Sequence, residues 1–365
     1  MLPLELPILS SIQSWLNWAW PIVLDHPAAT VGYGLNVLIR APIAVAIVSL
    51  VEYPVHRYLM HDSQIARWVR SERLKESSKD HLLHHFMWYR CFNDEPDPDG
   101  KLFNLHISGA SFLVFFVIAV SLTAAIDPLT GILTMLAGVA YLFVFNAVHE
   151  EMHLARDRWY TKNWLFEYWE LSHFLHHVNP SKNFNVLIPW VDPFFGTKMK
   201  PTSTDRETMK YAKRMLRLRN RLRASNLSGY VVSATDRGLA WLSGFSGEGC
   251  CIVLNNHAAI FTDCSQADEF RQSTRGGYVV SPHKNHPLLE IHGSADPTRN
   301  AAAWLGARLT DQERLGCCGW GPKLEPIWLT IASKGGQFVV DETIDLSIEN
   351  ALCSGQKREY AQPCR

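Results

Sequence analysis

Residues 149–177 read HEEMHLARDRWYTKNWLFEYWELSHFLHH, and five of these residues are histidines. Side chains three or four residues apart lie on one face of a helix. His149 and His153 therefore share a helical face, and so do His173, His176 and His177. The stretch predicts two helices, each of which presents a row of imidazoles.

Two further histidine groups lie upstream of this stretch. One repeats the spacing of the last group, whereas His56 and His61 are five residues apart and do not share a face in a straight α-helix. Either Pro54 distorts the helix there, or one of the two histidines lies past its end. Ten of the 16 histidines fall into the four groups: His56, His61, His81, His84, His85, His149, His153, His173, His176 and His177.

Clustered imidazoles on several helices indicate metal binding. Neutral imidazole suits iron, zinc, copper and nickel ions. Ten imidazoles exceed what one ion can hold, but they suit two ions at about five each, with positions left open for a small molecule. Residues beside the groups can orient the rings through hydrogen bonds, and the candidates are Asp80, Glu150, Glu151 and His106. His106 lies outside the four groups, and a plain structural role also suits it.

Long apolar stretches dominate the first 150 residues. About 20 apolar residues suffice to cross a bilayer, and four stretches approach that length: Leu6–Leu24, Tyr33–Leu59, Leu105–Ile126 and Leu129–Val148. Asp127 and Pro128 predict a tight turn between the last two. The alternative is a set of buried helices in a large soluble core, but residues 108–126 and 129–148 contain no charged side chain. We therefore expect an all-α membrane domain over residues 1–200, with about four transmembrane helices and a histidine-rich helical cap.

The distribution of basic residues predicts the orientation in the membrane. Segments 57–101 and 154–225 are rich in Lys and Arg, whereas the connections near residues 25–32 and 127–130 have none. The positive-inside rule then places all four histidine groups in the cytoplasm. The protein is expected to be an integral, multi-pass membrane protein with a cytoplasmic second domain.

The sequence changes character after residue 200. A basic, helix-like segment at 206–224 precedes short β-rich runs at 229–232, 251–254, 259–262 and 337–340, with helix candidates at 265–272 and 300–309. Strands alternating with helices predict a soluble α/β domain over residues 201–365. Lys plus Arg and Asp plus Glu both number 35, and this balance argues against a nucleic-acid partner bound by bulk charge.

The histidine groups resemble the histidine boxes of the fatty acid hydroxylase/sterol desaturase superfamily of membrane di-iron enzymes. The resemblance covers about residues 35–200, and it includes HFLHHVNPSKNFNV at 173–186 and DPFFGT at 192–197. It implies that the ten histidines are ligands of two iron ions, Fe2+ or Fe3+, with O2 as co-substrate. The implied reaction is hydroxylation or desaturation of an unactivated C–H bond of a fatty acyl, sterol or carotenoid lipid, in lipid biosynthesis.

The same resemblance implies a separate electron donor. The sequence shows no flavin, haem or iron–sulfur motif, so a cytochrome b5-like protein, a ferredoxin or a reductase would supply the electrons. The expected partners are thus a lipid substrate, the membrane and this donor.

Two other functions fit part of the pattern. His149-Glu-Glu-Met-His153 matches HExxH, in which two histidines bind zinc and the first glutamate is a general base. A membrane-embedded zinc hydrolase would, however, leave eight clustered histidines unexplained. A non-catalytic metal-binding scaffold, with the soluble domain as its working part, is the third hypothesis.

The second domain resembles the N-terminal domain of creatinase and Xaa-Pro aminopeptidases. The resemblance rests on RMLRLRNRL at 214–222, GYVVSATD at 229–236, LSGFSG at 242–247 and IFTD at 260–263. Cys264-Ser265 stands where that family usually has Gly/Ser-Arg-Tyr. The sequence lacks the peptidase catalytic domain that follows in that family, so no peptidase activity is expected. The domain is a candidate docking module or homodimer contact, a vestige, or a product of gene fusion.

Overall fold

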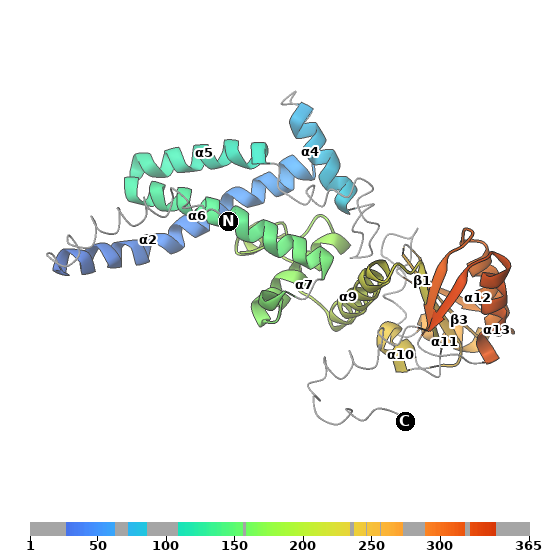
Figure 1. Ribbon diagram of the computed structural model, residues 1–365. Coiled ribbons are helices and arrows are strands. Elements are labelled where there is room, and N and C mark those ends of the chain that lie inside the picture. The colour runs from blue at the N-terminus through green and yellow to red at the C-terminus, as the bar shows by residue number, and fades with distance from the viewer. Residues whose placement is uncertain are drawn as a thin grey trace.

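The computed structural model describes residues 27–62, 72–85, 109–155, 158–233, 237–245, 247–255, 257–272, 289–317 and 322–340. Figure 1 shows long helices at one end, a mixed sheet with its own helices at the other, and helices α7 and α9 between them. The chain thus forms a helical region followed by an α/β region.

Three apolar helices form the outer part of the helical region. They are α2 (Pro27–Pro54), α5 (Gly109–Ile126) and α6 (Pro128–Leu154), and each packs against the other two. A Cβ on Gly138 of α6 would lie 2.1 Å from the Phe116 ring of α5, so only glycine permits this close approach. Helix α6 begins with Pro128 directly after Asp127, a favourable first helical position for proline. The predicted turn at Asp127 and Pro128 is therefore confirmed.

Two of these helices are long and apolar enough to cross a membrane. The candidate spans are Gly34–Met60, which continues past the end of α2, and Pro128–Leu154, which is α6. Helix α5 holds a shorter apolar helix, Phe115–Ile126, and the expected span Leu6–Leu24 lies outside the described residues. The structure thus supports two candidate spans, and the arrangement of about four stays a prediction.

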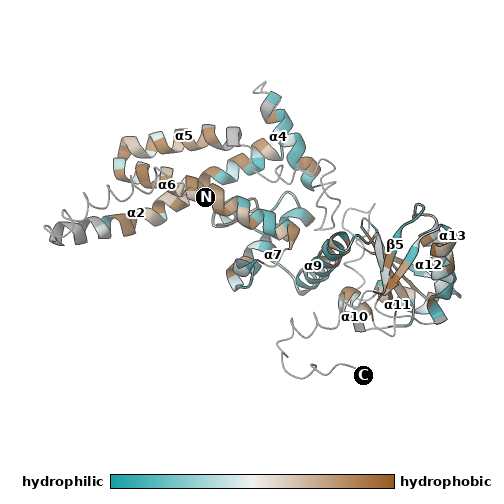
Figure 2. Cartoon of the chain, in the orientation of Figure 1, coloured by the Kyte–Doolittle hydropathy of each residue, from teal (hydrophilic) through white to brown (hydrophobic). Residues whose placement is uncertain are grey.

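Hydrophobic residues, brown in Figure 2, predominate along the three helices, and many of their large apolar side chains are exposed. Leu38, Leu122 and Phe143 are 71%, 62% and 75% exposed. Arg40 lies near the start of the first candidate span, and its guanidinium donates to the Asp127 carboxylate across 2.6 Å. The charge that the sequence places in this span is therefore paired at the tip of the α5–α6 hairpin.

A group of shorter elements lies at the other end of the long helices. The π-helical turn η1 (Val55–Met60) continues α2, and α4 (Glu72–Leu83) contacts it. After α6 come the 3-10 turn η5 (Trp159–Thr161), α7 (Trp164–Val178), the short α8 (Val191–Phe194) and α9 (Ser203–Ala224). The Asn163 side chain caps α7 by accepting from the amides of Leu165 and Phe166. The clustered histidines lie on or directly after η1, α4 and α7 and on the last turns of α6.

A six-stranded mixed sheet forms the α/β region. Its strands are β1 (Gly229–Ser233), β2 (Cys250–Leu254), β3 (Ala258–Thr262), β4 (Glu290–Gly293), β5 (Arg314–Cys317) and β6 (Gln337–Val340), in the order β4-β3-β2-β1-β5-β6. β1, β2 and β3 are joined by antiparallel pairing, whereas β4, β5 and β6 each pair in parallel with a neighbour. The mixed α/β fold expected for this region is confirmed.

Helices cover both faces of this sheet. Alternate residues of a strand point to opposite faces, so Tyr230 and Val232 enter one core and Val231 enters the other. The first core is closed by α9, α10 (Arg237–Ser243) and α11 (Cys264–Gln272), and the second by α12 (Pro297–Gly306) and α13 (Glu325–Ser333). The 3-10 turn η7 (Pro322–Leu324) leads into α13.

Helix α9 belongs to both regions. Its Ala212 is part of the apolar core of the helical region, and Met209 packs against that core. Its Met215, Leu218 and Leu222 lie in the first core of the sheet. The helical and α/β regions are thus in direct contact through one amphipathic helix.

Candidate metal centre

The structure brings all ten clustered histidines together. They form two groups of five in which one ring nitrogen from each residue lies within 4.8 Å of all the others in its group. Site A consists of His56, His61, His81, His85 and His176, and site B of His84, His149, His153, His173 and His177.

The two sites share helices. Helix α4 and the residues directly after it give His81 and His85 to site A and His84 to site B, while α7 gives His176 to site A and the other two histidines of its group to site B. The sites are consequently adjacent, with the ring centroids of His85 and His177 only 4.2 Å apart. This division matches the expectation of about five imidazoles for each of two ions.

A π-helical turn resolves the unusual spacing of the first pair. The amide of His61 donates to the carbonyl oxygen of His56 across 3.2 Å, an i to i+5 bond. Five residues make about one turn of such a helix, so the two rings lie 5.1 Å apart between centroids. Both explanations that the sequence left open contribute, because the turn follows Pro54 and His61 lies just past its end.

The nitrogen atoms of site A converge on one point. His81 Nε2 lies 3.1 Å from His56 Nε2, 3.0 Å from His61 Nε2 and 3.1 Å from His85 Nε2. One ring nitrogen carries either one hydrogen or one lone pair, so it cannot form three hydrogen bonds of this kind. Two ligands at right angles, each about 2.1 Å from one ion, lie about 3.0 Å apart. The distances therefore fit a shared metal ion better than a hydrogen-bond network.

Site B has the same geometry. His173 Nε2 lies 2.9 Å from both His149 Nε2 and His153 Nε2, and 3.0 Å from His177 Nε2. Both groups thus fit a bound ion by their donor set and by the spacing of the donor atoms. Nitrogen donors of this type are compatible with several transition metals.

Backbone carbonyls orient two ligands of site A. His56 Nδ1 donates to the Phe184 carbonyl oxygen, and His176 Nδ1 donates to the Lys182 carbonyl oxygen across 2.6 Å. A carbonyl oxygen can only accept, so the proton of each ring lies on Nδ1. The Nε2 lone pair of each ring then faces the centre of site A.

A buried carboxylate holds the loop that carries these carbonyls. Asp192 accepts from the amides of Phe184 and Asn185 across 2.9 and 3.1 Å and from the Thr197 hydroxyl across 2.8 Å. It is fully buried. The loop is therefore fixed by bonds whose loss would leave buried amides without acceptors.

A second buried carboxylate joins this loop to the long helices. Glu52 of α2 accepts from the Tyr141 hydroxyl of α6, from the Asn185 side chain and from the Val186 amide, across 2.6, 2.7 and 3.1 Å. One side chain thus links α2, α6 and the loop beside site A.

Burial keeps the imidazoles neutral. Desolvation, followed by the charges of neighbouring imidazoles, holds the pKa of His81, His84, His85 and His173 well below the ordinary value of 6.5. The same causes act on the pKa of His61 and His176. A metal ion binds the neutral form of imidazole, so the environment favours the state that coordination needs.

Four residues were expected to orient the rings through hydrogen bonds, and the structure describes three of them. Buried Glu151 forms an ion pair with Arg158 at 3.9 Å. The same role for Asp80 and Glu150 stays a prediction, and His106 lies outside the described residues. The sequence did not predict that the backbone carbonyls of Phe184 and Lys182 orient His56 and His176. Every residue has a backbone carbonyl, so the residue type does not indicate such a role. The HFLHHVNPSKNFNV resemblance did mark the segment in which they lie.

Comparison with known proteins bears on the second half of the chain. Residues 214–330 match the family described as the Creatinase/Prolidase N-terminal domain. The second half of the chain carries a domain of this type. A similar solved structure is the N-terminal domain of the cytoplasmic peptidase PepQ from Mycobacterium tuberculosis H37Rv, at 21% identity, 35% of this chain, 92% of that chain and a TM-score of 0.27. No curated protein matches the chain.

Proposed function

We propose that this protein is a membrane-bound di-iron oxidoreductase that uses O2 to hydroxylate or desaturate a C–H bond of a lipid. The observation that carries the proposal is the division of ten imidazoles into two adjacent five-membered sites. The resemblance of the four histidine groups to the boxes of the fatty acid hydroxylase/sterol desaturase superfamily supports iron as the metal. Electrons come from a separate protein donor.

The ligand count favours redox chemistry over hydrolysis. A zinc site of the HExxH type needs three protein ligands, a water and one glutamate base. Here His149 and His153 of that motif share their site with three further imidazoles, and a second full site lies beside it. Five nitrogen ligands per ion leave room for a small exogenous ligand on each iron. If bound at these sites, two iron ions would activate O2, which is the oxidant, with electrons from the separate donor.

The residues of the chain hold and shield this centre. Nine of the ten histidines are buried, so water is largely excluded from both sites. Phe184 and Lys182 fix two imidazoles through their carbonyls, while Asp192 and Glu52 fix the loop. Rigid ligands lower the cost of binding the ions and keep the donor atoms in place.

The long helices support a substrate that stays in the bilayer. At about 1.5 Å per residue, α6 extends about 33 Å from Asp127 to His149, close to the hydrocarbon thickness of about 30 Å. The Arg40–Asp127 pair then lies at one membrane surface, and the histidines lie at the other. The exposed apolar faces of α2 and α6 would then lie against lipid tails next to the centre.

The metal content of the full-length protein tests this function. We expect about two irons per chain after reconstitution under reducing conditions. His176→Ala should remove iron from site A and His173→Ala from site B, each with loss of O2-dependent lipid oxidation. His292→Gln in the α/β region is the matched control, because its ring pairs with Glu290. One zinc per chain that survives both alanine changes would overturn the proposal.

A further inference from the structure

A basic cavity lies between α7 and α9, outside the metal sites. Its volume is about 550 Å³, and its lining includes seven basic and only two acidic side chains. This volume lies in the range of roughly 300–1,000 Å³ that holds small molecules. Neither half of the chain forms the cavity alone, because α9 supplies one wall and α7 the other.

The cavity lies on the face of α7 that turns away from the histidines. Leu171 and Leu175 line it, whereas His173 and His177 belong to site B. Residues two apart on a helix point about 200° from one another. A ligand of the cavity therefore does not compete for the metal sites.

The basic side chains of the cavity differ in whether they form ion pairs with the protein's own carboxylates. The Lys213 ammonium donates to the buried Glu170 carboxylate across 2.6 Å, so these two charges compensate each other. Lys200, Arg206 and Lys210 are exposed, and within the described parts of the chain no ion pair involves them. A surplus of positive charge is thus available to a ligand.

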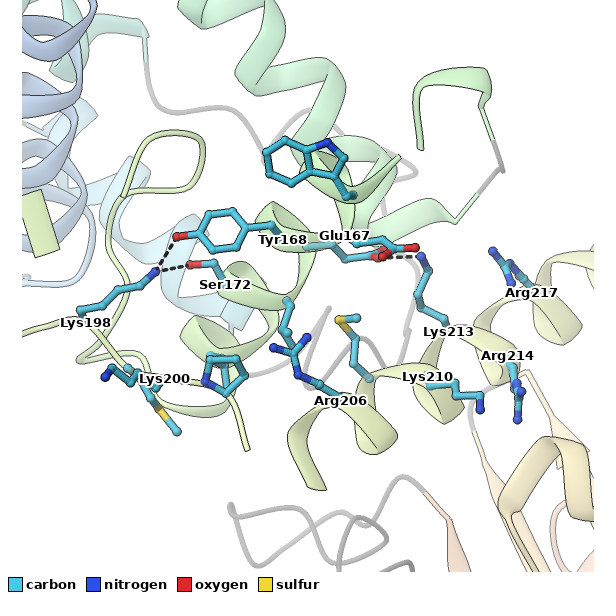
Figure 3. A pocket seen from close by; sticks show the side chains of 17 residues that line it. Glu167, Tyr168, Ser172, Lys198, Lys200, Arg206, Lys210, Lys213, Arg214 and Arg217 are labelled. Atoms are coloured by element: carbon cyan, nitrogen blue, oxygen red, sulfur yellow. Dashed lines mark hydrogen bonds and ion pairs between the residues drawn. The ribbon is translucent and has the colours of Figure 1, made fainter. Parts of the chain in front are cut away.

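Neutral donors complete the polar part of the cavity. Lys198 Nζ lies 3.4 Å from both the Tyr168 and the Ser172 hydroxyl oxygens. Figure 3 shows this group at one end of the cavity, Lys213 at the other, and Arg206 between them. Several lysines, an arginine and hydroxyls around one space form a typical phosphate site.

The cavity also has an apolar wall. Trp164, Leu171, Met199 and Met209 line it, and Trp164 is 76% exposed. A ligand that fills the cavity therefore has an apolar portion beside its charged group. We propose that this cavity binds a phosphate-bearing amphiphile, with the phosphate at the end of the cavity where Lys198, Lys200 and Arg206 gather.

Two sources can provide such a ligand, a phospholipid headgroup or a soluble phosphate ester. Binding to the full-length protein in an uncharged detergent separates them, with dihexanoyl phosphatidate and phenyl phosphate as probes and calorimetry as the readout. Dihexanoyl phosphatidylcholine is the zwitterionic control. Tighter binding of phosphatidate assigns the cavity to a lipid headgroup, and equal binding of both phosphates assigns it to phosphate esters in general.

Charge removal tests the location of the site. The triple variant Lys198→Gln, Lys200→Gln and Arg206→Gln should raise the Kd for phosphatidate at least about tenfold, because charge-assisted contacts are lost. A matched triple variant removes three exposed cations elsewhere: Lys162→Gln, Arg299→Gln and Lys323→Gln. It should bind as the parent does. Equal Kd values for the pocket variant and the parent, or no saturable binding of either phosphate, would overturn the proposal.

The outcome of this phosphate-binding experiment is independent of the proposed oxidoreductase function. Binding is measured without turnover and with all histidines intact, so the protein can fail as an oxidoreductase and still bind phosphate here. Conversely, loss of the phosphate site leaves the iron content unchanged.

Discussion

His85 and His177 show how densely imidazoles are packed at this centre. Their ring centroids are 4.2 Å apart although they belong to different sites. Such packing is stable only while the rings are neutral or bound to cations through their lone pairs, since adjacent imidazolium ions repel. The stability of the metal-free protein should therefore depend on pH.

The stability of the metal-free protein should fall as the pH drops below about 6.5. The pKa values of six histidines outside the candidate spans are lowered in the fold: His61, His81, His84, His85, His173 and His176. The unfolded chain takes up protons there while the folded chain does not, at about 1.4 kcal/mol per pH unit for each such histidine. The stability is fully present above 6.5 and is lost as the pH falls toward the lowered pKa values.

Denaturant unfolding in detergent between pH 8 and pH 5 measures this effect. His292→Gln, far from the centre, should show the same pH slope as the parent. A metal-free protein equally stable at pH 8 and pH 5 would contradict the expectation.

Sequence reasoning at this scale identified all ten residues of the two sites, although their role as ligands stays a prediction. It did not assign each histidine to a site, because that depends on how η1, α4, α6 and α7 are arranged in the fold. Residues three and four apart on one helix, such as His173 and His176, can serve different ions when the helix passes between them. The bonds of Asp192 to the loop amides likewise depend on the folded backbone.

Among the elements, α7 and α9 are joined by a buried ion pair. Lys213 compensates Glu170, whose side chain is 1% exposed. Burial raises the pKa of Glu170, and the Lys213 charge opposes that rise. Removing the lysine alone would leave an uncompensated buried carboxylate.

Lys213→Met should lower the free energy of unfolding by about 2–4 kcal/mol at pH 8. The loss should shrink as the pH falls, because a protonated Glu170 needs no partner. The double variant Glu170→Gln with Lys213→Met should recover most of the stability, since the buried charge is gone. Unfolding of the parent and of both variants at pH 8 and pH 5 tests this expectation, and a double variant as unstable as Lys213→Met would refute it.

Element prediction succeeded where the hydrophobic pattern was strong. Buried strands β1, β2 and β3 and the capped helix α9 lie close to their expected ranges. The short strand Glu290–Gly293 was not predicted, because its only large apolar residue is Ile291 and it pairs along one side at the sheet edge. The π-helical turn was also not predicted, although the spacing of His56 and His61 indicated an irregularity there.

At the scale of the whole molecule, the proposed membrane orientation makes a prediction. Ile126 at the hairpin tip is 87% exposed, and Cys264 in the α/β region is exposed with a free thiol. If α5 and α6 form a membrane hairpin, these positions lie on opposite sides of the bilayer.

Labelling in sealed vesicles tests this orientation. An impermeant thiol reagent should reach Cys264 from the cytoplasmic side alone and a cysteine introduced by Ile126→Cys from the other side alone. Both proteins carry Ser in place of Cys91, Cys318, Cys353 and Cys364, and the Ile126→Cys variant also carries Cys264→Ser, whereas Cys250, Cys251 and Cys317 are buried and stay. Labelling of both positions from the same side would exclude a spanning hairpin.

The position of helix α9 in two hydrophobic cores constrains the evolution of the chain as well as its folding. Its Ala212 side belongs to the core around the histidines, and its Leu222 side belongs to the sheet. A substitution that alters the volume of one side shifts the helix against the other. Over evolutionary time, the two halves of this chain therefore have to change together along Ser203–Ala224, and neither can be exchanged for a foreign module without refitting this helix.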